Sequence, residues 1–290
     1  MIPRWVDRAE YPFAPRRVTV DGVAMSYVDE GQGPVVLMVH GTPSWSFVYR
    51  HLVRGLRDGF RCVAPDLPGF GLSDRPSGDE YRPEDQARRL SGFIDVLGLK
   101  DLTLVVHDFG GPIGLAHAID RPGNVRRLVL FNTWMWSLAG ERRYARAAAL
   151  MSSRPGRFLY EQLGFSVHVL WRQAVRDVRY TPAIHAHYTA AMRDRAARHA
   201  SWVYARELLG SSAWFDELWQ RRDRLASIPA LVVWGMRDPA FATALPRWRA
   251  ALTNAEVVEW PDVGHAPQEV RGPEAAALVR RFLEAPRRMP

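Results

Sequence analysis

Residues 102–111 constrain the fold of this chain most, because an apolar run there ends abruptly in a polar pair and two glycines. The run Leu-Thr-Leu-Val-Val is followed by His107-Asp108 and then by Phe-Gly-Gly. This pattern predicts a buried strand that turns sharply into a helix and exposes the side chain at the turn. That side chain is Asp108. A carboxylate in this place favours attack on a saturated carbon atom, whereas a serine would favour attack on a carbonyl group.

Further short apolar runs alternate with helix-like stretches along the chain. The runs, which are rich in β-branched residues, cover residues 35–40, 61–66, 102–107, 125–131, 230–234 and 255–260. The helix-like stretches between them include residues 45–56, 83–97 and 111–119. This alternation predicts an α/β fold with a mostly parallel sheet that is covered by helices on both faces. Residues 17–30 instead predict an antiparallel hairpin that turns at Asp21-Gly22.

The alternation stops between residues 137 and 225. That region is rich in Ala, Arg, Trp and Tyr at helical spacing and contains no strand-like run. We therefore predict a core domain made of residues 1–136 and 226–290, with a helical cap of residues 137–225 inserted after the sixth strand. Residues 272–285 predict an amphipathic helix that closes the core.

Composition narrows the class of protein. The 290 residues are 47% apolar, enough for a large core, and a single cysteine, Cys62, excludes an internal disulfide. The net charge of +8 comes almost wholly from arginine, since Lys100 is the only lysine, and the arginines are dispersed among acids and apolar residues. No run reaches membrane-spanning length, and the N-terminus lacks an apolar signal segment. We expect a cytoplasmic protein without nucleic-acid or membrane partners.

Three acid–base residues follow strand-like runs in the order Asp108, Asp238, His265. Nucleophile, acid and histidine occur in this chain order in one large class of catalytic triads. Because parallel strands end at the same edge of a sheet, the three side chains are expected to meet there. No Gly-x-Ser-x-Gly sequence surrounds any serine, so the loop at residues 65–74 is given a structural role.

The residue types define a mechanism. An aspartate is ionised near neutral pH and needs no base to attack carbon, so Asp108 would displace a leaving group and become an ester. His265, oriented by Asp238, would then deprotonate the water that hydrolyses this ester. The sequence His-Gly-Thr-Pro places Thr42 after another strand. The backbone N–H groups of Thr42 and Phe109 are expected to hold the oxyanion.

With these residues the chain resembles the haloalkane dehalogenase and epoxide hydrolase branch of the α/β-hydrolases. The resemblance extends from Tyr-Pro-Phe at residues 11–13 through the His-Gly-x-Pro and His-Asp-Phe-Gly-Gly segments to Gly-His at residues 264–265. It is greatest to haloalkane dehalogenases whose acid follows a later strand, as Asp238 does. Asn132 stands where another subgroup carries a glutamate. The resemblance implies a hydrolase that acts on a small apolar organic substrate and water, without a cofactor.

Two departures from that family concern the leaving group. The family usually has tryptophan directly after the nucleophile, where its indole N–H holds the departing halide, but this chain has Phe109. Thr42 stands where the family commonly has asparagine or glutamate. Trp134 or Trp136 could supply the missing donor from the next strand. So could tryptophans of the predicted cap, namely Trp171, Trp202 and Trp214.

Two other functions stay open at this point. An epoxide hydrolase would use the same triad and a cap tyrosine to protonate the opened ring. The candidates are Tyr144, Tyr160, Tyr180, Tyr188 and Tyr204. A ligand-binding protein that keeps the fold without turnover is the third hypothesis, although such a protein has no need of a complete triad. The sequence contains no His-Glu-x-x-His motif that would indicate a metalloenzyme.

Overall fold

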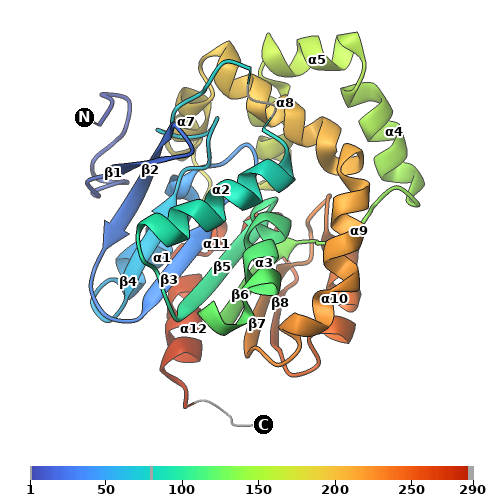
Figure 1. Cartoon of the computed structure of the whole chain (residues 1–290). Coiled ribbons are helices and arrows are strands. Elements are labelled where there is room, and N and C mark those ends of the chain that lie inside the picture. Colours follow the sequence, from blue (N-terminus) through green and yellow to red (C-terminus); the bar gives the residue numbers. More distant parts are fainter. Residues whose placement is uncertain (1, 79–80, 287–290) are drawn as a thin grey trace.

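A computed structural model describes residues 2–78 and 81–286, and Figure 1 shows the whole chain. Its centre is an eight-stranded sheet with the order β1-β2-β4-β3-β5-β6-β7-β8. The strands are β1 (Arg16–Val20), β2 (Val23–Glu30), β3 (Val35–Val39), β4 (Arg61–Pro65), β5 (Leu102–Asp108), β6 (Val125–Thr133), β7 (Ala230–Gly235) and β8 (Glu256–Trp260). β2 pairs antiparallel with both β1 and β4, and all other neighbouring strands pair parallel. The predicted α/β sheet is confirmed.

The first two strands form the predicted hairpin, in which Val20 pairs with Val23. The two residues between them, Asp21 and Gly22, have φ values of 47° and 77°. Positive φ at both positions is the requirement of the tight turn whose twist matches that of the flanking strands.

Helices cover both faces of the sheet. In the core they are α1 (Arg50–Leu56), α2 (Pro83–Val96), α3 (Gly110–Asp120), α10 (Leu245–Ala251), α11 (Pro267–Val270) and α12 (Gly272–Glu284), with short 3-10 turns η1 (Ser46–Tyr49), η2 (Pro122–Asn124) and η5 (Ala242–Ala244). α2 packs against α3 on one face, and α1 packs against α12 on the other (Figure 1). Among residues 2–78 and 81–286, no helix combines the length and the apolar character that a bilayer crossing needs.

The described chain between β6 and β7 contains helices and no strand. These inserted helices are α4 (Arg142–Met151), α5 (Arg154–Glu161), the π-helix η3 (Ser166–Trp171), α6 (Arg172–Ala174), α7 (Pro182–Ala191), α8 (Arg195–Gly210), α9 (Ser212–Gln220) and η4 (Arg222–Leu225). α4, α5, α7 and α8 lie beyond one end of the sheet, whereas α9 runs beside the core next to α3 (Figure 1). The insertion after the sixth strand agrees with the sequence, and the division into core and cap at residues 136 and 226 stays a prediction.

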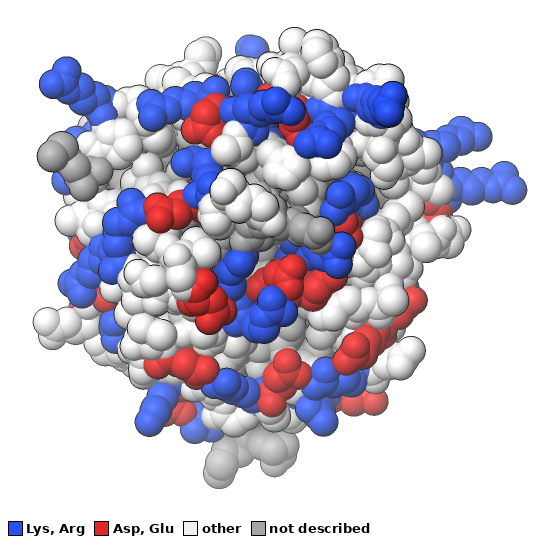
Figure 2. All heavy atoms as spheres, turned by 45° about the horizontal axis from the view of Figure 1, so that its top comes forward, with Lys and Arg blue, Asp and Glu red and all other residues white. Residues whose placement is uncertain are grey.

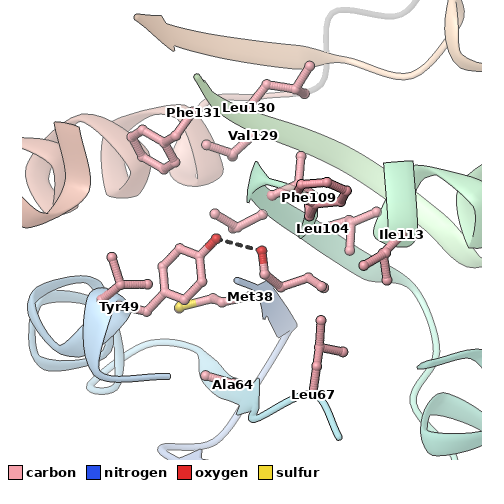
Figure 3. Packing of buried hydrophobic residues seen from close by; sticks show 14 of the residues in the cluster. Met38, Tyr49, Ala64, Leu67, Leu104, Phe109, Ile113, Val129, Leu130 and Phe131 are labelled. Carbon is pink, nitrogen blue, oxygen red and sulfur yellow. Dashed lines mark hydrogen bonds between the residues drawn. The ribbon is translucent and has the colours of Figure 1, made fainter. Parts of the chain in front are cut away.

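β5 lies in the middle of the sheet, between β3 and β6, and all seven of its residues are buried. Apolar side chains from the neighbouring strands and helices surround it, including Met38, Ile113 and Phe131 (Figure 3). The buried phenol of Tyr49 donates to the Val39 carbonyl at 2.8 Å (Figure 3). A buried polar group therefore keeps a hydrogen bond inside an apolar layer.

The turn after β5 brings backbone segments into close contact. A Cβ atom on Gly110 would lie 2.0 Å from the Val39 carbonyl oxygen, and one on Gly111 would lie 1.7 Å from Thr133 Oγ1. Only glycine fits these two positions, because the strand-to-helix turn passes directly against β3 and β6.

Gly110→Ala is expected to lower the free energy of unfolding by about 1–3 kcal/mol or more, because the added methyl group overlaps backbone atoms. Gly123→Ala is the matched control, since a Cβ there meets no atom within 4 Å. Urea unfolding of both variants measures the difference. Equal midpoints would show that the turn moves aside without cost.

Candidate active site

Asp108 ends β5 in the left-handed conformation, with φ at 53°, and its residue surface is 6% exposed. This conformation is rare for a residue with a side chain and turns the carboxylate away from the strand direction. The backbone N–H of Thr42 donates to Asp108 Oδ1 at 2.8 Å. One carboxylate oxygen is thus held by the expected oxyanion donor, and the other oxygen faces His265.

His265 lies between two carboxylates. Its Nε2 is 3.4 Å from Asp108 Oδ2, and its Nδ1 is 2.9 Å from Asp238 Oδ2. The structure therefore brings together all three residues that the sequence singled out. The backbone of His265 is fixed too, since its N–H donates to the Ala174 carbonyl at 2.9 Å and its carbonyl oxygen lies 2.9 Å from Nε2 of His107.

His107 supports this arrangement as a neutral donor. Burial, aided by the positive charge of His265, lowers the pKa of His107 to about 3. A neutral imidazole carries one N–H, and the contact with the His265 carbonyl requires that proton on Nε2. The residue directly before Asp108 thereby anchors the loop that carries His265.

Asp238 is buried and receives donors on both of its oxygens. Oδ1 accepts from the Ala240 N–H at 2.7 Å, and Oδ2 accepts from Asn132 Nδ2 at 2.9 Å. Burial acts to raise the pKa of Asp238, yet His265 and these donors hold that pKa below its ordinary value. Asn132, which stands where a relative could carry a second acid, instead donates to the acid that is present.

Electrostatics set the protonation state of His265. Burial acts to lower its pKa, but the charges and hydrogen bonds of Asp238 and Asp108 outweigh burial and raise the pKa to about 10. The resting site therefore holds an imidazolium between two carboxylates. Loss of the charge on Asp108 would lower the pKa of His265, because one of its two flanking charges would be removed.

The two residues that depart from the family pattern have other contacts. Thr42 Oγ1 donates to Ser201 Oγ on α8 at 2.9 Å, so its hydroxyl proton is already used. The Phe109 ring packs between Tyr204, at a centroid distance of 4.5 Å, and Trp134, at 4.7 Å. Neither Thr42 nor Phe109 offers a free side-chain donor to a leaving group.

Trp134 is fully buried beside Phe109, and its ring stacks on Phe241 at 4.5 Å. Phe241 in turn contacts the ring of His265 at 5.8 Å. The indole N–H of Trp134 has no acceptor in the part of the chain that the structure describes. A buried donor without a partner is costly, so this N–H is a feature that a ligand would complete.

The other candidate tryptophans have their own contacts. Trp171 Nε1 donates to Tyr180 Oη at 2.9 Å, and Trp202 Nε1 donates to the Met151 carbonyl at 2.8 Å. Trp136 packs edge-on against Trp219, at 4.9 Å. Trp214, only partly buried, packs against Phe215 at 5.4 Å on α9.

Most of the tyrosines considered as proton donors likewise have contacts of their own. Tyr144 Oη donates to the Ala240 carbonyl at 2.5 Å, Tyr188 Oη donates to Glu269, and Tyr180 Oη accepts from Trp171. Tyr204 packs on Phe109. Tyr160 on α5 is also buried, and burial together with the negative charge of Asp108 raises its pKa well above the ordinary value.

A buried ion pair that the sequence does not predict lies next to the His265 loop. Arg50 binds Glu269 through two hydrogen bonds, each 2.7 Å long, and both side chains are almost fully buried. Tyr188 of α7 donates to the same carboxylate. Glu269 lies on α11, directly after the His265 loop. No local signal links Arg50 to Glu269, because they are 219 residues apart.

Two further predictions from the sequence concern the loop of residues 65–74 and metal binding. Ser73 is buried, and its hydroxyl donates to the Asp66 carbonyl at 2.6 Å and accepts from the Ser26 N–H at 2.7 Å. These bonds are consistent with the structural role given to its loop. Within residues 2–78 and 81–286, no group of three or more His, Cys, Asp or Glu side chains is arranged to hold a metal ion.

Comparisons with known proteins identify the fold and the family of this chain. Residues 34–271 match the family described as "alpha/beta hydrolase fold". Over 94% of this chain and 96% of the relative, 39% of residues are identical to Haloalkane dehalogenase 2 of Mycobacterium tuberculosis strain H37Rv. A cis-3-alkyl-4-alkyloxetan-2-one decarboxylase of Xanthomonas campestris is 34% identical over 94% of this chain and 97% of its own.

Among solved structures, a loop variant of haloalkane dehalogenase DbeA from Bradyrhizobium elkanii superposes with a TM-score of 0.78 at 25% identity, covering 93% of this chain and 97% of that one. Fold and triad thus define a hydrolase of the α/β-hydrolase fold with an aspartate nucleophile. Within that fold, the chain belongs to the haloalkane dehalogenase family. The resemblance drawn from the sequence is confirmed.

Asp108→Asn is expected to lower the pKa of His265, because one of its two flanking charges is removed. In the native protein the stability contributed by His265 is complete below about pH 6.5 and is lost as pH rises through about 10, since the folded pKa is raised. NMR titration of the imidazole measures the change. Asp262→Asn, at an exposed residue three positions before His265, is the control and leaves the pKa in place. An unchanged pKa in Asp108→Asn would contradict the electrostatic account.

Proposed function

We propose that the protein hydrolyses the carbon–halogen bond of a small apolar haloalkane to an alcohol and a halide, through an ester on Asp108. The observation that carries this proposal is the line of contacts from the Thr42 N–H through Asp108 and His265 to Asp238. In this line, one oxygen of Asp108 accepts from the Thr42 N–H, which can stabilise negative charge. The other oxygen faces His265, a base that Asp238 orients.

The first step uses the free oxygen of the nucleophile. Asp108 Oδ2 attacks the substrate carbon, a carbon–oxygen bond forms, and the halide leaves with the electron pair of the carbon–halogen bond. Oδ1, which already accepts from Thr42 N–H, becomes the carbonyl oxygen of the ester. No proton transfer is needed in this step. Loss of the charge on Asp108 then lowers the pKa of His265, so that its imidazolium releases a proton to solvent.

The second step hydrolyses the ester. His265 takes a proton from water, and the water oxygen attacks the carboxyl carbon of Asp108, which places the negative charge on Oδ1. The N–H groups of Thr42 and Phe109 would stabilise that charge. Collapse breaks the bond between the carboxyl carbon and the alkyl oxygen, and the alcohol leaves with a proton from His265. The Asp108 carboxyl that remains carries the second proton of the water, and transfer of this proton to His265 restores the Asp108 carboxylate and the imidazolium.

Trp134 is the residue that we assign to the departing halide. Its buried indole N–H is unpartnered in the described chain and adjoins Phe109, the position from which a family tryptophan would donate. A donor from the end of β6 would thus replace one from the elbow. Residues 137–225, as a cap, would cover this site and exclude bulk water, as the α8 contacts of Thr42 and Phe109 support.

Opening of a strained oxygen ring is the second candidate. Tyr160, a buried tyrosine of α5, is the candidate that would protonate an epoxide oxygen as the ring opens. The Xanthomonas relative is named for an oxetan-2-one, a four-membered ring that likewise contains a strained bond between oxygen and saturated carbon. The lack of an indole directly after the nucleophile is compatible with such a leaving group.

His265→Gln is expected to trap the ester, since the first step needs no base but the second does. Intact-mass measurement after incubation with a short bromoalkane should show one alkyl group added to the protein. Asp108→Asn should show none. A substrate panel of bromoalkanes, epoxides and a cis-3,4-dialkyl oxetan-2-one identifies the leaving group. An unmodified His265→Gln protein and an inactive native enzyme across this panel would contradict the mechanism, and ligand-induced stabilisation retained in Asp108→Asn would then indicate a binding protein.

Trp134→Phe is expected to lower kcat/KM for bromoalkanes by about 10²–10³, the typical effect of losing one transition-state donor. It should also weaken product inhibition by bromide. Trp136→Phe is the matched control, because Trp136 is buried two residues away among other aromatic rings. If both variants lose the same activity, Trp134 acts by packing and not by donation.

A further inference from the structure

The outer side of the helix pair α4 and α5 carries an unusual combination of charge and exposed apolar surface. Both helices pack their inner sides on α8 and form the outermost part of the inserted helices (Figure 1). Between residues 142 and 163 the sequence has five arginines and a single acid, Glu161. The Glu161 side chain is only 2% exposed and is held by Arg157, Arg195 and His199. The negative charge of Glu161 is therefore paired within the structure and is not presented at the surface.

Three of the five arginines have no partner of opposite charge. Arg142, Arg146 and Arg154 are exposed and make no ion pair with any carboxylate in the described chain. Arginines at the opposite end of the molecule are paired, as Arg126 is with Asp101 and Arg281 is with Glu256. Figure 2 turns the inserted helices toward the viewer, and Lys and Arg side chains project at the margins of the surface that it shows.

Large apolar side chains are exposed among these arginines. Of the six large hydrophobic side chains that are exposed in residues 2–78 and 81–286, five lie between residues 137 and 225. Three of them belong to this helix pair and the turn after it, namely Leu150 at 50%, Phe158 at 56% and Leu163 at 56% exposure. An amphipathic surface that joins arginines with Phe and Leu is typical of helices that lie in the interface of a membrane.

We propose that the outer side of α4 and α5, the cap surface of residues 142–163, binds reversibly to the surface of an anionic lipid bilayer. The unpaired arginines would meet lipid phosphates, while Leu150, Phe158 and Leu163 enter the boundary between headgroups and acyl chains. A second copy of the chain would bring like charges together, and a nucleic acid would meet the arginines but leave the aliphatic side chains in water.

The proposal differs from the expectation, drawn from the sequence, that the protein has no membrane partner. Along the chain the arginines look dispersed, and within the described residues no helix is long and apolar enough to cross a bilayer. The fold removes Glu161 from the surface and leaves three arginines of two consecutive helices, Arg142, Arg146 and Arg154, without an ion pair among the described residues. The result is local binding to a surface and not insertion across it.

Flotation with lipid vesicles tests the proposal on the full-length protein. We expect binding to vesicles of phosphatidylcholine with about one third phosphatidylglycerol and little binding to phosphatidylcholine alone. Binding should weaken as salt is raised, because the screening length falls from about 30 Å at about 0.01 M to about 8 Å at about 0.15 M. No flotation, or flotation that ignores lipid charge, would overturn the proposal.

Two pairs of variants locate the contact. Arg142→Gln with Arg146→Gln and Arg154→Gln should lower the partition coefficient about 100-fold, since each cation near the surface contributes about fivefold. The control replaces Arg126, Arg249 and Arg281 by glutamine, which changes the net charge equally at the other end of the molecule. Equal loss in both triple variants would overturn the assignment of the surface.

Phe158→Ser with Leu163→Ser should lower binding at least about tenfold. Val96→Ser, which removes an exposed apolar side chain from α2, should leave binding unchanged. Thermal unfolding verifies that every variant is folded. Salt-sensitive binding of double-stranded DNA without flotation would assign this surface to nucleic acid instead and would also overturn the proposal.

Discussion

Two buried carboxylates share one imidazole, and much of the core is arranged to hold them in place. Asp108 and Asp238 come from the ends of two parallel strands, and His265 follows a third. Each acid would be costly to bury alone, but His265 and backbone or amide N–H groups compensate both. The same arrangement raises the pKa of His265 to about 10 after burial has acted to lower it. Charge on the nucleophile therefore decides when the histidine can act as a base.

The close contacts at the elbow make this arrangement rigid. Gly110 and Gly111 allow the turn to touch β3 and β6. Gly41, where a Cβ would lie 2.0 Å from Asp108 Oδ1, leaves room for the carboxylate beside the N–H of Thr42. The left-handed backbone at Asp108 is held by contacts on both sides of the strand. Strain at a single residue is thereby supported by the packing of the sheet centre.

The sequence predicted the sheet, the hairpin, the place of the insertion and the residues that meet, because each depends on local patterns and on the common edge of parallel strands. Other features depend on contacts between distant segments. The Arg50–Glu269 pair, to which Tyr188 also bonds, and the bond from Thr42 to Ser201 follow from how the inserted helices pack on the core. Periodicity carries no information about such packing. Asn132 lies between these cases, since its position was recognised but its hydrogen bond to Asp238 was not.

The backbone N–H of His265 donates to the carbonyl of Ala174, a residue of the inserted segment, at 2.9 Å. Tyr188 of the same segment is bonded to Glu269 just beyond the histidine loop. A displacement of α6 or α7 would therefore also move the loop that carries His265. The position of these inserted helices and the alignment of the histidine with Asp108 are thus mechanically coupled.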